Sequence, residues 1–499
     1  MRKLRLLALL LAVMSVISGF VACGGDDDGE DVTPDDFNGS IADTDDDDDD
    51  SDDETEVNEY VPNEGKAEDV VEIHTANDLV TKLARKGTFI LMADIDLTGV
   101  DYKPFGNYFY PFEGKLQGNG HKITGLKTTT VTSETLGPAY ITYKYAYCGL
   151  FGATKNADIT DLTIEGADVS YSTNTEYCNT VAGILAGYMT DTKVTGCSIS
   201  GKLTAKSKQY YAYGGGVAGI LSGGNLENVT VNAEIVTEDS YQRAISGGIA
   251  AYVFNASQIY NCSANGTVKA VSSYGVAYCG GLIGYTRSVT LTVCRSEADV
   301  YAESQFVDSY KGTSGSATAG GIIGLVSSES DTSKTKIVRC YSLNNSVEAN
   351  GNYNSAYAGG IAARAMTSDI TDCYSRSSVT ISSDSKTVYV GSAFGILDKE
   401  YTIKGCFAYG NVSVNHPNIH QVYIGGFSGY PIRPNTQRLK NCVYNVNASF
   451  TVNGEAAPAV GPSATPVASG MFTLSALKNT LQWKDSEWRQ DGSEFIPIS

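Results

Sequence analysis

The residues best suited to metal or acid–base chemistry are few and scattered along the chain. The four histidines are His74, His121, His416 and His420. His416 and His420 would lie on one face of a helix and could share a metal, but Pro417 between them favours a loop. We therefore predict neither a metal site nor a cofactor.

Carboxylate pairs are the other candidates, because polysaccharide lyases and hydrolases use clustered acids. Asp158 with Asp161 and Asp369 with Asp372 are the clearest pairs. The two pairs fall in the first and the seventh copies of a repeat along the chain, which corresponds to about 30 Å and is too far for them to act together. The sequence contains no nucleophile elbow and no phosphate-binding loop. We predict that the protein is not an enzyme and keep a polysaccharide lyase or hydrolase as the alternative.

Tyrosine is in excess, with 32 copies against 15 phenylalanines. Five tyrosines come two residues before a glycine-rich position that recurs along the chain: Tyr213, Tyr278, Tyr357, Tyr389 and Tyr423. Facing outward, they would form an aromatic ladder for sugars or a protein partner. Simple alternation instead places them on the same side as the inward residues Leu282 and Ile361, unless the chain bends between. A structural stacking column is favoured, and ligand binding stays open.

These candidates belong to a repeat of about 33 residues, which indicates a solenoid or a propeller. One copy is Gly280-Gly281-Leu282-Ile283-Gly284, followed by an aliphatic stretch that ends at Cys294. The equivalents of Cys294 in nine copies are Leu162, Cys197, Val229, Cys262, Cys294, Cys340, Cys373, Cys406 and Cys442, separated by 35, 32, 33, 32, 46, 33, 33 and 36 residues.

The one long separation places extra loops around residues 301–319 and 327–336. Insertions in solenoids usually lie on one face and often carry binding. Phe306, Tyr310 and Lys311 are our candidate contacts in the first loop. The alternative is a solvent-exposed loop with no ligand.

Each copy contains three short stretches of strand-forming composition and no helical periodicity. The three are the Gly-Gly segment, a stretch with an aliphatic residue three before the anchor, and an alternating stretch such as Val300 and Ala302. Three strands joined by bends make one coil of a parallel β-helix. We predict an all-β, right-handed parallel β-helix of about nine to eleven coils, with a short N-terminal capping helix and a C-terminal cap.

Seven of the nine anchors are cysteines, and equivalent positions would stack along the solenoid. Parallel Cα–Cβ vectors would leave stacked Cβ atoms about 4.8 Å apart, wider than a disulfide favours. No anchor has a CxxC neighbour, so metal spacing is also absent. We predict a column of buried free thiols that act as small apolar groups.

The repeated glycine segments resemble those of the GLUG-motif family. The matching stretches include Cys148-Gly149-Leu150-Phe151-Gly152 and Val217-Ala218-Gly219, and residues 111–126 are similar to the first coil of such proteins. The resemblance covers roughly residues 68 to 450, with the GLUG-like repeats at residues 148–452, and it implies a β-helix. It implies little about activity, because such repeats accompany adhesins, peptidases and other proteins.

The first 23 residues form an export signal, with cations before an apolar run too short to span a bilayer. The signal ends at Cys23 in a stretch that resembles a bacterial lipobox, which implies lipidation of that cysteine. Residues 24–66 contain 19 Asp or Glu and no Lys or Arg between Asp26 and Glu59, and this composition predicts an acidic, disordered tether. Their start resembles the surface-export signal of Bacteroidetes lipoproteins.

The repeats are expected to be closed at both ends, because an open end would expose apolar surface and unpaired backbone. Residues 67–147 form the N-terminal cap and first coil, with a helix that begins after Thr75. Residues 453–499 form a linker and a C-terminal cap, in which Trp483 and Trp488 are expected to plug the last coil.

Together these features predict a lipid-anchored outer-membrane protein that faces the cell exterior. Its body would be an adhesin or binding module for an extracellular glycan or a host or surface protein. A structural spacer is a second alternative to the enzyme. Nucleic acid is not expected as a partner, since the folded part has no basic stripe.

Overall fold

The computed structural model describes residues 62–129, 132–136, 143–305, 315–327, 334–352, 354–398, 400–417, 421–430, 438–458, 464–484, 486–492 and 494–498. The chain divides into two units, residues 1–55 and 56–499, and the described residues all belong to the second. Cys23, most of the acidic leader, and the predicted contacts Phe306, Tyr310 and Lys311 lie outside the described residues.

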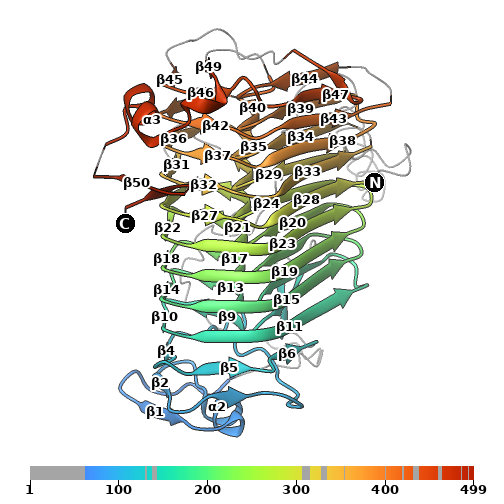
Figure 1. Ribbon diagram of the computed structural model, residues 1–499. Helices are drawn as coiled ribbons and strands as arrows, with labels where there is room; N and C mark the ends of the chain where they lie inside the picture. The colour runs from blue at the N-terminus through green and yellow to red at the C-terminus, as the bar shows by residue number, and fades with distance from the viewer. Residues whose placement is uncertain are drawn as a thin grey trace, which may run out of the picture. The chain divides into compact units, whose positions relative to one another are not determined.

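The second unit is a parallel β-solenoid, which confirms the predicted fold class (Figure 1). The chain passes in each coil through four faces, here called sheets A, B, D and C in that order. The predicted three strands per copy are therefore one too few, because the strand of sheet D, just before the Gly-Gly segment, was not counted. Sheet A has twelve strands: β1 (Val70–Ile73), β2 (Thr88–Leu91), β4 (Lys115–Gln117), β10 (Asp158–Thr160), β14 (Lys193–Thr195), β18 (Asn225–Glu227), β22 (Ser257–Tyr260), β26 (Val289–Thr292), β31 (Thr335–Val338), β36 (Ser368–Thr371), β41 (Tyr401–Lys404) and β45 (Leu439–Lys440).

Sheet B carries the longest strands and divides into two short strands per coil toward the C-terminal end. Its strands are β3 (Ile95–Asp96), β5 (Lys122–Thr124), β6 (Lys127–Thr128), β11 (Thr163–Thr173), β15 (Ser198–Ser207), β19 (Thr230–Asp239), β23 (Ser263–Ser272), β27 (Arg295–Ser296), β28 (Asp299–Ser304), β32 (Tyr341–Ser342), β33 (Ser346–Gly351), β37 (Tyr374–Ser375), β38 (Ser378–Ser382), β42 (Phe407–Ala408), β43 (Val412–Asn415), β46 (Val443–Asn445), β47 (Phe450–Val452), β48 (Glu455–Ala456) and β49 (Thr465–Val467).

Sheets D and C are the other two faces. Sheet D has β7 (Thr132–Leu136), β8 (Tyr143–Cys148), β12 (Cys178–Gly183), β16 (Ala212–Gly215), β20 (Arg243–Gly247), β24 (Val276–Gly280), β29 (Ser316–Gly320), β34 (Ser355–Gly359), β39 (Thr387–Gly391) and β44 (Gln421–Gly425). Sheet C has β9 (Phe151–Lys155), β13 (Ala186–Thr190), β17 (Ala218–Ser222), β21 (Ala250–Phe254), β25 (Ile283–Arg287), β30 (Ile323–Ser327), β35 (Ala362–Ala365) and β40 (Phe394–Leu397). Each complete coil contributes one strand to sheet A and one to sheet C, so the number of strands in these sheets measures the number of coils. Sheet C has eight strands and sheet A has twelve, and the predicted nine to eleven coils lie between these numbers.

Parallel pairing stacks equivalent residues of successive repeats, and these columns form the interior. The residue three before each anchor is buried in every coil, as Ile259, Leu291 and Ile337 show in adjacent strands of sheet A. The anchor cysteines are also free and buried, which confirms the predicted thiol column. Burial raises the pKa of the anchor thiol Cys197 to about 11. It raises the pKa of Cys148, a buried cysteine at the end of β8 and not an anchor, to about 12, so both thiols stay protonated.

The bend from sheet A into sheet B explains a further regularity of the repeat. The residue before each anchor has a positive φ of 50° to 66°. Only glycine, asparagine and aspartate adopt this conformation readily. The occupants are Asp161, Gly196, Asn228, Asn261, Val293, Arg339, Asp372, Gly405 and Asn441.

The Gly-Gly segment forms the bend from sheet D into sheet C, where the backbones of the two sheets meet closely. A Cβ atom on Gly280 would collide with the carbonyl oxygen of Ile283, and one on Gly281 with that of Gly321 in the next coil. Larger residues would therefore force the coils apart.

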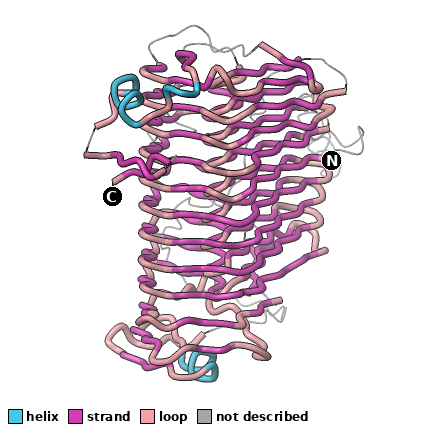
Figure 2. The backbone as a smooth tube through the Cα atoms, in the orientation of Figure 1, coloured by secondary structure: helices cyan, strands magenta, loops and turns pink. Residues whose placement is uncertain are grey.

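The N-terminal end is covered as predicted. Helix α2 (Ala76–Lys82) begins at Thr75, whose hydroxyl accepts a 3.1 Å hydrogen bond from the Asp78 amide. Leu79 of this helix is fully buried in the same cluster as the interior of the coils. In Figure 2 the helix lies beside the first strands at one end of the stack.

The C-terminal segment is present, but the prediction that its tryptophans plug the last coil is wrong. Helix α3 (Leu474–Leu481) and the hairpin of β50 (Trp488–Asp491) and β51 (Glu494–Pro497) pack on the outside of sheet B. They cover a column of stacked rings, Tyr341, Tyr374 and Phe407, which are 5.0 and 4.6 Å apart. Figure 1 shows β50 beside the middle coils. The 3-10 turn η3 (Ser469–Met471) precedes α3.

Candidate binding surfaces

The predicted tyrosine column faces outward, because the chain bends between it and the interior residues. In β24, Ala277 and Cys279 point into the interior cluster, whereas Tyr278 between them belongs to a separate cluster outside it. The Gly-Gly bend then turns Leu282 inward. Simple alternation from Leu282 to Tyr278 therefore gave the wrong side.

The five tyrosines do not form one continuous ladder. Strand register gives the column Tyr213, Ile245, Tyr278, Thr318, Tyr357, Tyr389 and Tyr423. Ile245 and Thr318 interrupt it. Within this column the first two tyrosines are therefore not adjacent to each other or to the last three.

Tyr213 and Tyr278 are held in a closed aromatic cluster, with exposures of 3% and 8%. Rings of sheet C face them, among which Tyr252 and Tyr285 stack at 4.9 Å. Tyr213 itself lies 6.4 Å from Tyr252. This burial supports a structural function for the first two tyrosines.

Tyr357, Tyr389 and Tyr423 are half-buried and stacked face to face. Successive ring centroids are 5.1 Å apart, with interplanar angles of 5° and 6°. Arg364 lies 4.9 Å above the Tyr357 ring. Burial and the neighbouring tyrosines raise the pKa of Tyr389 to about 12. Because each face covers the next, this ladder presents mainly ring edges and hydroxyl groups, and little ring face for stacking a sugar.

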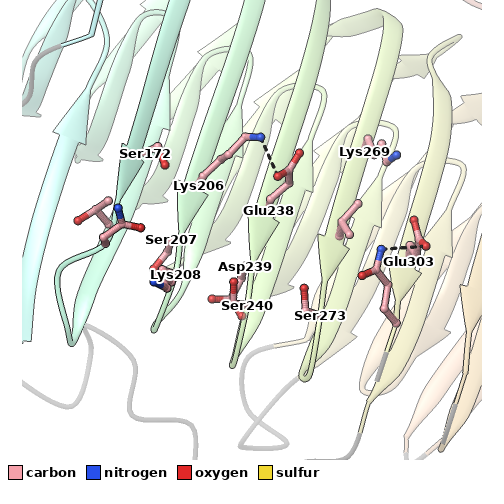
Figure 3. A pocket seen from close by; sticks show the side chains of 14 residues that line it. Ser172, Lys206, Ser207, Lys208, Glu238, Asp239, Ser240, Lys269, Ser273 and Glu303 are labelled. Atoms are coloured by element: carbon pink, nitrogen blue, oxygen red, sulfur yellow. Dashed lines mark hydrogen bonds and ion pairs between the residues drawn. The ribbon is translucent and has the colours of Figure 1, made fainter. Parts of the chain in front are cut away.

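A second surface, which the sequence analysis missed, is a groove at the C-terminal ends of sheet B strands (Figure 3). We call it the polar groove. It has a volume of about 510 Å³ and crosses β11, β15, β19, β23 and β28. Its lining residues are Ser172, Thr173, Asn174, Lys206, Ser207, Lys208, Glu238, Asp239, Ser240, Lys269, Val271, Ser273, Glu303 and Gln305.

One edge of the polar groove is a row in which every coil contributes a hydrogen-bonding side chain. Backbone hydrogen bonds place the residue after each strand above its equivalent in the preceding coil. The row reads Asn174, Lys208, Ser240, Ser273 and Gln305. Neighbouring coils are about 4.8 Å apart, so these groups recur at that spacing along about 19 Å.

The floor of the groove is fixed by side chains that cap the turns leaving sheet B. The Ser207 hydroxyl accepts a 3.1 Å hydrogen bond from the Tyr210 amide, and Ser272 accepts one of 2.9 Å from the Gly275 amide. Asp239 accepts from the Gln242 amide in the same way, and burial raises the pKa of its carboxyl well above the ordinary value. These capped turns hold the edge row in place.

The charged groups of the groove are only partly paired with one another. Lys206 and Glu238 form an ion pair at 2.8 Å. Glu303 accepts hydrogen bonds from the Tyr301 hydroxyl at 3.1 Å and the Gln305 amide at 3.2 Å. Figure 3 marks the Lys206–Glu238 ion pair and a hydrogen bond at Glu303, and shows Lys206, Glu238 and Glu303 on different strands of the groove.

Aromatic rings stand next to this surface. Tyr241 and Tyr274 follow Ser240 and Ser273 in the chain and stack at 5.2 Å with an interplanar angle of 22°. Both are half-buried. Gln305, which lines the groove, is the last described residue before the loop that holds the predicted contacts.

The groups considered for catalysis are not brought together. Asp158 and Asp369 occupy the same column of sheet A, six strand steps and therefore about 29 Å apart. His416 is fully buried, with Nε2 2.8 Å from the Ser385 carbonyl oxygen. Among the described residues, no group of His, Cys, Asp and Glu could hold a metal ion.

Comparisons with solved structures give a distant structural likeness. No family model and no curated protein matches the chain. A crystal structure from Bacteroides ovatus, of a protein provisionally described as an immunoglobulin A1 protease, is 17% identical, with a TM-score of 0.37. The match covers 86% of this chain and 91% of that chain. A likeness at this level says nothing about activity.

The described helices give no indication of a membrane span. None of them is long and apolar enough to cross a bilayer.

Proposed function

We propose that this chain is a cell-surface binding module that holds an extended extracellular glycan in the polar groove. The observation that carries the proposal is the edge row, where five successive coils each offer an amide, hydroxyl or ammonium group. Such groups at a fixed spacing suit a hydroxyl-rich polymer laid along the stack. Weak contacts repeated along one rigid surface then add up.

Binding without catalysis is part of the proposal. Glu238 is held by Lys206, and Glu303 by Tyr301 and Gln305. The two glutamates lie two strand steps apart in one column, about 9.6 Å along the stack. That separation is at the outer limit for the carboxylate pair of an inverting hydrolase.

The proposed location follows from the leader. Acylation of Cys23 would anchor the chain in the outer membrane, and the acidic leader would act as a tether between the anchor and the body. The GLUG-family resemblance of the repeats supports this setting, because repeats of that kind accompany surface adhesins. A host or surface protein is the other class of partner.

The test is an array of glycans and matrix proteins probed with the purified full-length chain, with retention and product release both recorded. We expect saturable retention on glycans, no new products, and weaker retention for the Ser240→Ala, Ser273→Ala double variant. Thr290→Ala, Thr292→Ala on the outer face of sheet A is the matched control. Release of shortened glycans would contradict the proposal and indicate an enzyme. Absence of retention on every glycan would favour a protein partner or a structural spacer.

A further inference from the structure

The charges of the polar groove indicate which class of glycan it takes, an inference that rests on the proposed function. The groove contains three lysines, Lys206, Lys208 and Lys269. The first is neutralised by Glu238. Neither of the other two has a carboxylate within ion-pair distance in the part of the chain that the structure describes.

The acids that could balance these two cations are engaged elsewhere. Both oxygens of Glu303 accept hydrogen bonds, from Tyr301 and Gln305. Asp239 is 3% exposed and faces the turn that it caps. The groove therefore offers two ammonium groups that belong to no ion pair, beside one carboxylate, Glu303, whose charge its neutral donors do not cancel. The three lysines of the groove outnumber its two carboxylates outside the buried turn, Glu238 and Glu303.

The two cations are placed to act on one extended ligand. Lys208 is exposed in the edge row after β15, whereas Lys269 lies in β23, two strand steps and about 9.6 Å farther along the stack. The Lys269 ammonium group lies 4.8 Å above the Tyr301 ring, which restricts its position. Figure 3 shows Lys208 and Lys269 on different strands on opposite sides of Glu238.

We propose that the polar groove binds an acidic polysaccharide, with anionic groups on separate sugars held by Lys208 and Lys269. Ser240 and Ser273 then take hydroxyl groups between the two anions, and Asn174 and Gln305 take hydroxyl groups one coil beyond them on either side. Carboxylate and sulfate groups share the chemistry that the lysines recognise, because both are acceptors for charge-assisted hydrogen bonds.

The experiment measures retention of the purified full-length chain on polygalacturonate, dextran sulfate and neutral dextran, at low and at physiological salt. We expect retention on one or both acidic polymers and much less on dextran, with weaker binding as salt rises. Whichever acidic polymer binds tighter identifies the anionic group. Lys208→Ala and Lys269→Ala should each weaken binding about 5- to 10-fold, whereas Lys208→Arg should retain it.

Lys202→Ala is the matched control, because it removes the same charge from β15, the strand that Lys208 follows, but outside the groove, where Lys202 pairs with Glu234 at 2.9 Å. Circular dichroism of every variant checks the fold. Equal loss of binding in Lys202→Ala, or equal retention on double-stranded DNA, would overturn recognition by the groove. Dextran bound as tightly as the acidic polymers would overturn the acidic class and leave glycan binding standing. Failure on all three polymers would overturn the acidic class, and the glycan array then decides whether glycan binding itself stands.

Discussion

The Asn261 side-chain amide donates a 2.6 Å hydrogen bond to the side-chain oxygen of Asn228, its equivalent one coil away. Both residues have a positive φ, of 50° and 55°. The same two positions thus provide the left-handed bend and a side-chain link between coils. An asparagine at this position therefore stabilises both the bend within its own coil and the stacking of that coil on its neighbour.

We expect Asn261→Ala to destabilise the fold by about 2 kcal/mol, from left-handed strain and the lost hydrogen bond. Asn261→Gly keeps the backbone free to bend, so it should cost about 1 kcal/mol or less. Asn225→Ala, on the exposed face of sheet A, is the control and should change little. Urea unfolding measures all three. Equal costs for the alanine and glycine variants would show that the backbone conformation is unimportant.

Most of the solenoid could be predicted from the sequence because parallel stacking makes each repeat impose the same pattern on its neighbours. The buried column at Ile259 and Leu291 follows directly from the spacing of the repeats. The N-terminal helix followed from the cap at Thr75. The left-handed position before each anchor was not predicted, although glycine, asparagine or aspartate fills it in every copy except at Val293 and Arg339.

The candidate surfaces could not be predicted in the same way. The direction of Tyr278 depends on a bend at Gly280, which breaks the alternation along the strand. The polar groove depends on which residue follows each strand end, and that position shifts with loop length. The place of Trp488 depends on Tyr374, which is recognised as its partner only when the coils are stacked.

The interior cysteines should be unreactive in the native protein. Ten free cysteines are buried, and burial raises the pKa of thiols such as Cys373 and Cys406 well above the ordinary value. We expect no reaction of these ten with Ellman's reagent under native conditions, and complete reaction in guanidinium chloride. Loss of titratable thiols in the denatured, unreduced protein would instead indicate disulfides.

Asp239 should make stability depend on pH. Burial raises the pKa of the Asp239 carboxyl in the folded protein, whereas in the unfolded chain its pKa is about 3.9. The protonated form is therefore favoured by folding, and its contribution to stability is lost as pH rises from about 4 toward the folded pKa. Asp239→Asn removes this dependence.

Urea unfolding at several pH values tests this. We expect wild type to lose stability relative to Asp239→Asn as pH increases above about 4. The two proteins should be most alike at the acid end, which serves as the internal control. A difference that stays constant with pH would contradict the assignment.

Cys23 should carry the membrane anchor. We expect Cys23→Ala to abolish incorporation of a labelled fatty acid and to move the protein from the membrane fraction to the soluble fraction. Cys178→Ala is the control, because it removes a buried cysteine of the β-solenoid and should leave fatty-acid labelling unchanged. Labelling that survives Cys23→Ala would exclude a lipoprotein anchor at this position.

The C-terminal segment should undock before the solenoid unfolds, because it packs outside the interior cluster. The Tyr374 hydroxyl donates a 2.9 Å hydrogen bond to the Phe495 carbonyl oxygen and accepts one of 3.3 Å from the Phe495 amide. Tyr374→Phe removes both, which should weaken docking by about 2 kcal/mol.

The chain's two tryptophans, Trp483 and Trp488, both belong to this segment and stack at 4.1 Å. Tryptophan fluorescence therefore reports docking, whereas circular dichroism reports the coils. We expect Tyr374→Phe to move the fluorescence transition to lower urea and to leave the dichroism transition in place, with Tyr260→Phe on sheet A as the control. If both transitions moved together, the segment would be part of the cooperative unit that holds the coils.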